Sequence, residues 1–224
     1  MSSMGLFLAT AVIPLLFGLW AQMKVKRTFA RYSQVAPRNG MTGAEAAAAV
    51  LRSSGLPQLS IRPVAGRLTD HYDPRNRTLN LSADVGQASS LAALGVAAHE
   101  AGHAIQDARR YAPMRVRQAL VPAATIGQSL WFLPVVLGLV LGLTGLVTVG
   151  LVLFAAIVLF QLVTLPVEFD ASKRALAALE GQGVLAADEV PGARAVLNAA
   201  ALTYVAGFVA ALGQLVYFFL ISRD

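Results

Sequence analysis

The apolar residues of this chain gather in blocks that are long enough to cross a bilayer. The first block, residues 4–23, carries no charge and has Trp20 near its far end. A membrane core needs about 20 apolar residues in a helix, so we expect a spanning helix here. A cleaved signal peptide is the alternative. In a signal peptide, however, the basic residues precede the apolar block, whereas here Lys24, Lys26 and Arg27 follow it.

Two further apolar regions complete this pattern. Residues 119–165 contain no charged residue, which is too long for one span and fits two, at 119–142 and 146–166. The tight turn between them is expected at Leu143, Thr144 and Gly145. The last block, 199–221, predicts a fourth span. The fold class that follows is an α-helical membrane protein with about four transmembrane helices.

The longer polar segment, residues 24–118, mixes helical and extended patterns. Thr42 is expected to cap a helix over 41–51, with Glu45 as its capping-box partner. Residues 61–64 and 67–72 have the composition of extended chain. The segment is therefore predicted to be an α+β portion outside the membrane.

A hairpin is predicted just before the middle of the chain. Asp73-Pro74 and Asn76 supply turn chemistry, and residues 78–82 alternate polar and apolar side chains like a strand. An edge strand at this place could hold an extended peptide by strand addition. A hairpin that only covers the core is the alternative.

The second polar segment, residues 167–198, is predicted to be helical. An amphipathic helix over 167–179 is ended by Gly181 and Gly183. A new helix begins near Asp188 or Glu189, before Pro191, and turns apolar at Asn198.

One stretch, residues 91–106, contains a spacing that specifies a chemistry. On a helix, His99 and His103 lie one turn apart on the same face and can reach one metal ion. Glu100 then lies beside the metal, where it can take a proton from a metal-bound water. The alternative is a buried helix with a structural role. Burying two imidazoles and a carboxylate without partners would cost several kcal/mol, so the pattern favours a catalytic Zn²⁺ site.

A third ligand is needed to complete such a site. Glu168, directly after the third apolar block, is the favoured candidate, because His₂Glu is a common catalytic zinc set. Asp107 competes, but one more helical turn moves it about 5 Å along the axis. Asp170 is a weaker ligand candidate, and it could instead form a hydrogen bond to one of the metal ligands.

Composition restricts the chemistry further. The chain has 224 residues, of which 56% are hydrophobic and 13% charged, and no cysteine. Disulfides, cysteine-ligated zinc and thiol catalysis are therefore excluded. The formal charge of +6 could indicate nucleic acid, but in a protein with several spans basic residues mark the cytoplasmic side. No nucleic-acid partner is expected.

The distribution of basic residues predicts the topology. Of the 18 lysines and arginines, 17 lie in the two polar segments, which also contain every proposed metal ligand, and the remaining one is Arg223. We therefore expect the active site to face the cytoplasm and both termini to lie outside it.

Several motifs together resemble those of a known family, the YugP-like membrane zinc metallopeptidases of bacteria. These enzymes are related in active-site design to HtpX-type and CAAX-type gluzincins. The motifs, which extend over most of the chain, are Asp70-His71-Tyr72-Asp73-Pro74, Leu79-x-Leu81-Ser82, Ala97-Ala98-His99-Glu100-x-Gly102-His103-Ala104-x-Gln106, Leu165-Pro166-Val167-Glu168-Phe169-Asp170-Ala171-Ser172 and Ala200-Ala201-Leu202-Thr203-Tyr204-Val205-Ala206. The resemblance implies a zincin-like cytoplasmic metalloprotease portion in a bacterial inner membrane protein.

The resemblance also implies roles for individual residues. His99, His103 and Glu168 match the zinc ligands, and Glu100 matches the general base. The wider gluzincin pattern has Asp four residues after the ligand Glu, where this chain has Ser172, so the group that orients the histidines stays open among Ser172, Asp170 and Asp107.

The oxyanion of the reaction needs a stabilising group as well. His71, Tyr72 and Tyr204 are candidates for it or for substrate contacts, with a purely structural role as the alternative for each.

The function predicted from the sequence is hydrolysis of peptide bonds by zinc-activated water. The expected partners are a protein or peptide substrate and the lipid bilayer, and the sequence identifies no other. Two alternatives stay open: an intramembrane zinc protease, and a membrane scaffold with a vestigial zinc site. The first needs the motif on a spanning helix, but residues 91–106 are short and polar for one. The second leaves Glu100 without a use.

Overall fold

The computed structural model describes residues 3–222, and its chain divides into two compact units. We call them the span unit (Met1–Gln22, Ala112–Pro166 and Leu202–Asp224) and the site unit (Met23–Tyr111 and Val167–Ala201). Residues 1–2 and 223–224, with the chain termini and Arg223, lie outside the described part, so the predicted side of the termini stays a prediction.

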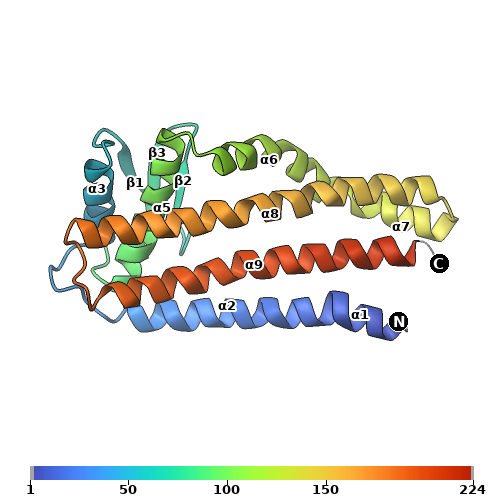
Figure 1. The fold of residues 1–224 in the computed structure, drawn as a ribbon, viewed down its shortest axis with the longest axis horizontal. Helices are drawn as coiled ribbons and strands as arrows, with labels where there is room; N and C mark the ends of the chain where they lie inside the picture. Colours follow the sequence, from blue (N-terminus) through green and yellow to red (C-terminus); the bar gives the residue numbers. More distant parts are fainter. Residues whose placement is uncertain (1–2, 223–224) are drawn as a thin grey trace. The chain divides into compact units, whose positions relative to one another are not determined.

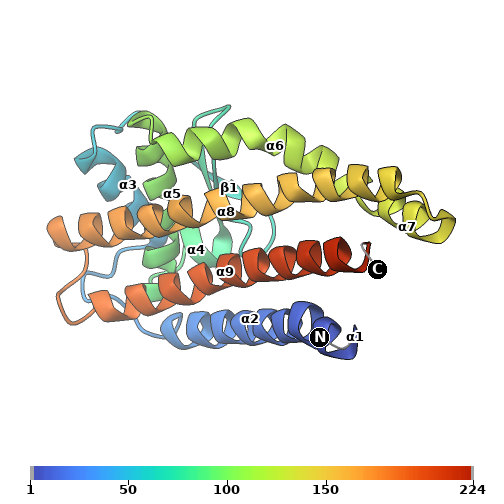
Figure 2. The ribbon, with the colours of Figure 1, turned by 45° about the vertical axis from the view of Figure 1, so that its right-hand side comes forward.

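Apolar helices make up the span unit. Their order along the chain can be followed in Figures 1 and 2. The helices that contribute to it are α1 (Ser3–Phe7), the π-helical turn η1 (Leu8–Val12), α2 (Ile13–Tyr32), α6 (Ala112–Leu130), α7 (Phe132–Leu141), α8 (Thr144–Gly181) and α9 (Val190–Ile221). Three helices among the described residues are long and apolar enough to cross a membrane, or four if the bent pair α6 and α7 counts as one span. The molecule is thus a mostly helical protein with three or four candidate spans.

The second apolar region differs from the expected single helix over 119–142. Helices α6 and α7 meet at Trp131 and are bent by 42°. Pro134, in the first turn of α7, has no N–H to continue the hydrogen bonds of α6, and its ring opposes an unbroken helix. The connection to α8 also lies slightly earlier than expected, at Gly142 and Leu143, where Gly142 has φ +67°.

Helix α8 runs without a break from Thr144 to Gly181. We expected a division between a span ending at 166 and a separate helix from 167 on. Instead Pro166 lies inside the helix, a position that helices in apolar surroundings tolerate. The polar segment that carries Glu168 therefore continues the third apolar block directly.

A small sheet, three short helices and the ends of three long helices build the site unit. The capping box of α3 (Gly43–Ser53) is confirmed, since Thr42 and Glu45 bond each other's backbone N–H. The expected hairpin is also confirmed: β2 (His71–Asp73) pairs antiparallel with β3 (Thr78–Ser82).

The sheet has a third strand in addition to the hairpin, in the segment around residues 61–64 that was expected to be extended. Strand β1 (Ser60–Val64) pairs parallel with β3, which gives the order β1-β3-β2 and leaves β2 at one edge. Residues 67–72 are extended only at their end, because Gly66 and Leu68 adopt positive φ.

The core of the site unit lies between this sheet and the motif helix. Strand β3 is followed by the short α4 (Ala83–Gly86) and then by α5 (Leu91–Ala108), which Figure 1 shows beside the strands. Leu79 of β3, Val85 of α4 and Leu94 of α5 are fully buried. Burying these side chains holds the sheet against the helix that carries His99 and His103.

Candidate metal centre

The motif lies on a helix whose sequence supports it. Helix α5 is rich in alanine and leucine, which have high helix propensity. Ser90 caps its start by accepting a hydrogen bond from the N–H of Ala93 at 3.2 Å. The prediction of a helix over 91–106 is therefore confirmed.

A glycine inside the motif lets a second helix approach. A Cβ on Gly102 would lie 2.6 Å from the carbonyl oxygen of Ala171 on α8, a separation that ordinary side chains do not tolerate. The backbones of α5 and α8 thus touch at a residue between the two histidines. This contact brings Glu168 and Ser172, each within one turn of Ala171, to the histidines.

Both motif histidines face Glu168. Its Oε2 lies 3.1 Å from Nε2 of His99 and 3.6 Å from Nε2 of His103. The three side chains are largely shielded, with exposed fractions of 13%, 9% and 3% for His99, His103 and Glu168. Two donors about 2.1 Å from a tetrahedral zinc ion lie about 3.4 Å apart. The observed separations fit this spacing.

Glu100 lies at the same place but is held differently. One carboxylate oxygen of Glu100 and one ring nitrogen of each of His99 and His103 lie within 4.8 Å of one another. Oε2 of Glu100 also accepts a hydrogen bond from the backbone N–H of Tyr72 at 3.1 Å. Glu168 lies within 3.6 Å of both Nε2 atoms, and Glu100 is bonded to the backbone of β2, so the geometry suits Glu168 as a ligand and Glu100 as a neighbour of the metal.

Burial and nearby charges shift the pKa values of Glu100 and His103. Burial raises the pKa of Glu100 above its usual value, an effect that the nearby histidines partly offset. For His103, burial acts to lower the pKa, but the carboxylates of Glu168 and Glu100 outweigh it and raise the pKa. Two acids therefore surround the imidazole of His103.

The second ring nitrogen of each histidine has its own partner. Nδ1 of His99 lies 3.1 Å from Oγ of Ser172, and Nδ1 of His103 lies 3.0 Å from Oε1 of Gln106. Gln106 is fully buried and donates through Nε2 to the carbonyl of Val167 and to Asp170, both at 2.8 Å. Asp170 in turn binds Arg174.

The orienting role of Gln106 is not among our expectations from the sequence. Its position is the available signal, because it lies three residues after His103 on the same helical face. Of the two residues expected to support the ligands, Ser172 contacts His99 directly, and Asp170 is linked to His103 only through Gln106.

Tyr72 and Asp107 form a separate link between the edge strand and the motif helix. The Tyr72 hydroxyl donates to Oδ2 of Asp107 at 2.8 Å, and its side chain is buried. Burial and the Asp107 carboxylate raise the pKa of Tyr72 to about 12. Asp107 thus points to the strand, and Glu100 and Asp107, two helical turns apart, both bind the same residue of β2.

The other two candidates are His71 and Tyr204. His71 is exposed, with Nδ1 at 2.8 Å from the carbonyl of Thr69 and Nε2 at 3.2 Å from the amide of Asn80. Tyr204 belongs to the span unit. The structure therefore gathers seven of the sequence candidates in the site unit around His99, namely Glu100, His103, Glu168, Ser172, Asp170, Tyr72 and Asp107.

The chain is similar to known proteins. A family model described as putative neutral zinc metallopeptidase matches residues 7–223. The chain is 42% identical over 222 residues to the protein named putative membrane protease YugP of Bacillus subtilis (strain 168), covering 98% of each chain. No solved structure matches.

Proposed function

The chain belongs to the neutral zinc metallopeptidase family, and from this we propose that it is a membrane-held endopeptidase whose zinc site is the His99, His103 and Glu168 cluster. The observation that carries the proposal is the convergence of both Nε2 atoms on one carboxylate, with Glu100 beside them. Two imidazoles and a carboxylate are the donor set of many catalytic zinc sites.

Zinc is the metal of this family. When bound, it polarises the scissile carbonyl and lowers the pKa of a coordinated water toward about 7. His99 and His103 would hold it through Nε2, because Ser172 and Gln106 occupy their Nδ1 atoms. Fixing the rings from behind in this way is how zinc ligands are usually oriented.

Glu100 is the proposed general base. It takes one proton from the attacking water while the water oxygen bonds to the scissile carbonyl carbon. It then gives this proton to the nitrogen of the leaving amine as the C–N bond breaks. The raised pKa of Glu100 suits this shuttle, because a stronger base accepts the proton more readily.

Strand β2 is the proposed support for substrate backbone. In its pairing with β3 the outward-facing residue is Tyr72, whose N–H points to Glu100 on α5. An extended peptide at the edge of β2 would lie near Glu100, which accepts the hydrogen bond from the Tyr72 N–H. Strand addition of this kind holds the main chain without reading much sequence, which suits an endopeptidase.

The side of the membrane is part of the proposal. The site unit contains His99, His103 and Glu168 and most of the basic residues, which favours a cytoplasmic α+β zincin-like portion at the inner membrane surface of a bacterial cell. Its substrates are then cytoplasmic proteins or the cytoplasmic parts of membrane proteins.

The test compares wild-type protein with Glu100→Gln, purified in mild detergent and supplied with an unstructured reporter polypeptide. The variant keeps all proposed ligands, so zinc content should be unchanged while cleavage falls about 100- to 10,000-fold. Asp188→Asn, a change in an exposed ion pair, is the matched control and should cleave normally. Cleavage by Glu100→Gln at the wild-type rate would refute the mechanism.

A further inference from the structure

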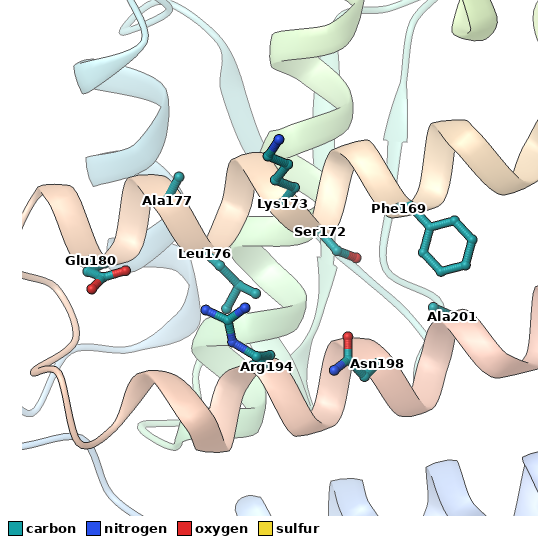
Figure 3. A pocket seen from close by; sticks show the side chains of 9 residues that line it. All are labelled: Phe169, Ser172, Lys173, Leu176, Ala177, Glu180, Arg194, Asn198 and Ala201. Atoms are coloured by element: carbon teal, nitrogen blue, oxygen red, sulfur yellow. The ribbon is translucent and has the colours of Figure 1, made fainter.

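A groove of about 290 Å³ lies between the last turns of α8 and the first turns of α9, within the site unit. Figure 3 shows its lining. The residues that line it from α8 are Phe169, Ser172, Lys173, Leu176, Ala177 and Glu180, and those from α9 are Arg194, Asn198 and Ala201. The proposed mechanism uses only one of these residues, Ser172.

The charged lining of this α8–α9 groove is two cations, Lys173 and Arg194, and one carboxylate, Glu180, so its net charge is positive. Arg194 and Asn198 are exposed, and neither makes a hydrogen bond or ion pair among residues 3–222. Figure 3 shows both side chains directed from α9 toward α8, where Ser172 points back toward them. A guanidinium offers a planar pair of N–H donors that matches two oxygens of a phosphate.

The other end of the groove is apolar and leads to the spans. Phe169 is half exposed, and both Phe169 and Ala201 lie within three residues of the points where α8 and α9 pass into the span unit. Arg194 is two helical turns, about 10 Å, farther along α9 than Ala201. Lipid headgroups occupy a zone about 5–7 Å thick outside the hydrocarbon core. The backbone of Arg194 lies beyond a zone of that thickness measured from Ala201, and its long side chain can reach back to a headgroup.

A peptide substrate fits this place less well. The groove borders Ser172, which contacts the Nδ1 atom of His99, whereas the metal-facing Nε2 atom points to Glu168. A peptide lying along the groove would therefore pass behind the ligand, away from Glu100. The charge, the apolar end and the position along the helices together favour a lipid.

We propose that the α8–α9 groove binds the phosphate headgroup of an anionic phospholipid, with Arg194 and Asn198 on the phosphate and Phe169 against the start of an acyl chain. Because Ser172 forms part of the wall and also contacts His99, the bound lipid lies one side chain from the proposed zinc ligand. The inference concerns lipid binding and holds whether or not the peptidase mechanism is right.

The test uses the full chain in nanodiscs of phosphatidylcholine with or without phosphatidylglycerol, and native mass spectrometry to count retained lipid. Wild-type protein should retain phosphatidylglycerol, and Arg194→Gln should retain about fivefold less. Arg194→Lys should retain an intermediate amount of phosphatidylglycerol, because lysine keeps the positive charge but lacks the planar pair of N–H donors. Arg52→Gln, an exposed arginine at the end of α3, is the control and should match wild type.

Two further binding measurements distinguish a phospholipid from free phosphate and from a peptide as the ligand of the groove. Inorganic phosphate added to phosphatidylcholine discs should not bind, and an acidic peptide should not displace phosphatidylglycerol. Equal retention by wild type and Arg194→Gln, binding of free phosphate alone, or displacement by the peptide would each overturn the proposal. If Arg194→Gln fails to fold, as judged by thermal unfolding, Asn198→Ala replaces it with the same expected direction.

Discussion

The amide of Gln106 decides which nitrogen of His103 is free for a metal. Its Nε2 donates to two acceptors, the carbonyl of Val167 and the carboxylate of Asp170, so its Oε1 must face the imidazole. An amide oxygen only accepts, and therefore Nδ1 of His103 carries the proton. The lone pair of Nε2 is then directed to Glu168, which is the tautomer that a zinc ligand requires.

The two acidic candidates for the third ligand can be separated by metal content. Glu168→Ala removes the oxygen that faces both histidines, and we expect zinc binding to weaken by about 100-fold or more. Asp107→Ala removes the acceptor of the Tyr72 hydroxyl and should leave zinc binding near wild type. Elemental analysis of the purified variants, with competition by a chelator, measures the difference. Equal zinc content in the two variants would contradict the assignment.

The hydroxyl of Tyr72 should contribute to stability in a way that depends on pH. Tyr72→Phe removes its hydrogen bond to Asp107, and we expect a loss of about 1 kcal/mol in the free energy of unfolding near neutral pH. The pKa of Tyr72 is raised to about 12 in the folded chain, against about 10 unfolded. The contribution is therefore complete below pH 10 and is lost as the pH rises toward 12.

Thermal unfolding in detergent across this pH range tests the effect. The difference between wild type and Tyr72→Phe should shrink between pH 10 and pH 12. Tyr32→Phe is the control, because its hydroxyl makes no hydrogen bond among residues 3–222. A difference that stays constant with pH would show that the hydroxyl of Tyr72 does not carry the contribution.

At the scale of elements, the contact between α5 and α8 decides whether the site exists. The two helices meet backbone to backbone at Gly102 and Ala171, with no room for a Cβ. On one side of this contact lie the histidines, and on the other lie Glu168 and Ser172. The separation of the two helices therefore sets the separation of the proposed ligands, His99 and His103 on α5 and Glu168 on α8.

Gly102→Ala should consequently damage the zinc site without touching a ligand. The added methyl group must push α8 away from α5, and overpacking of this kind costs about 1–3 kcal/mol. We expect weaker zinc binding together with a lower unfolding temperature. Gly181→Ala, at the end of α8 with no atom within 4 Å of the added carbon, is the control. Wild-type zinc affinity in Gly102→Ala would refute the argument.

Elements that depend on neighbouring residues could be predicted from the sequence. Contacts between residues far apart in the chain could not. The capping box of Thr42, the hairpin turn after Asp73 and the alanine-rich motif helix are each determined by neighbouring residues. The continuity of α8 through Pro166 depends on surroundings that a sequence pattern does not describe. The pairing of β1 with β3 and the contact of Gln106 with Val167 join residues far apart in the chain.

For the whole molecule, the charge distribution predicts which compartment the site unit faces. Of the 18 basic residues, 17 lie in the two polar segments, and these should stay in the cytoplasm. Cysteines introduced at Gly40 and Gly183, both at turns of the site unit, should be protected from an impermeant reagent in intact cells. Natural cysteines do not interfere, because the chain has none.

The control for this experiment is a cysteine expected on the other side. Ser222, at the end of the fourth apolar block, should react in intact cells, and Gly40 and Gly183 should react only after the membrane is opened. Labelling of Gly40 in intact cells would reverse the topology and place the substrates in the other compartment.

The unbroken course of α8 also has a consequence for the order in which the protein is made. His99, Glu100 and His103 leave the ribosome first, but Glu168 follows the 55 residues of Ala112–Pro166 that belong to the span unit. Because Glu168 continues the same helix as the third apolar block, the ligand cannot reach the histidines until that hairpin has been synthesised. The newly made polar segment 24–118 would thus lack the proposed third ligand. The proposed metal centre can therefore be complete only once the third apolar block has been synthesised.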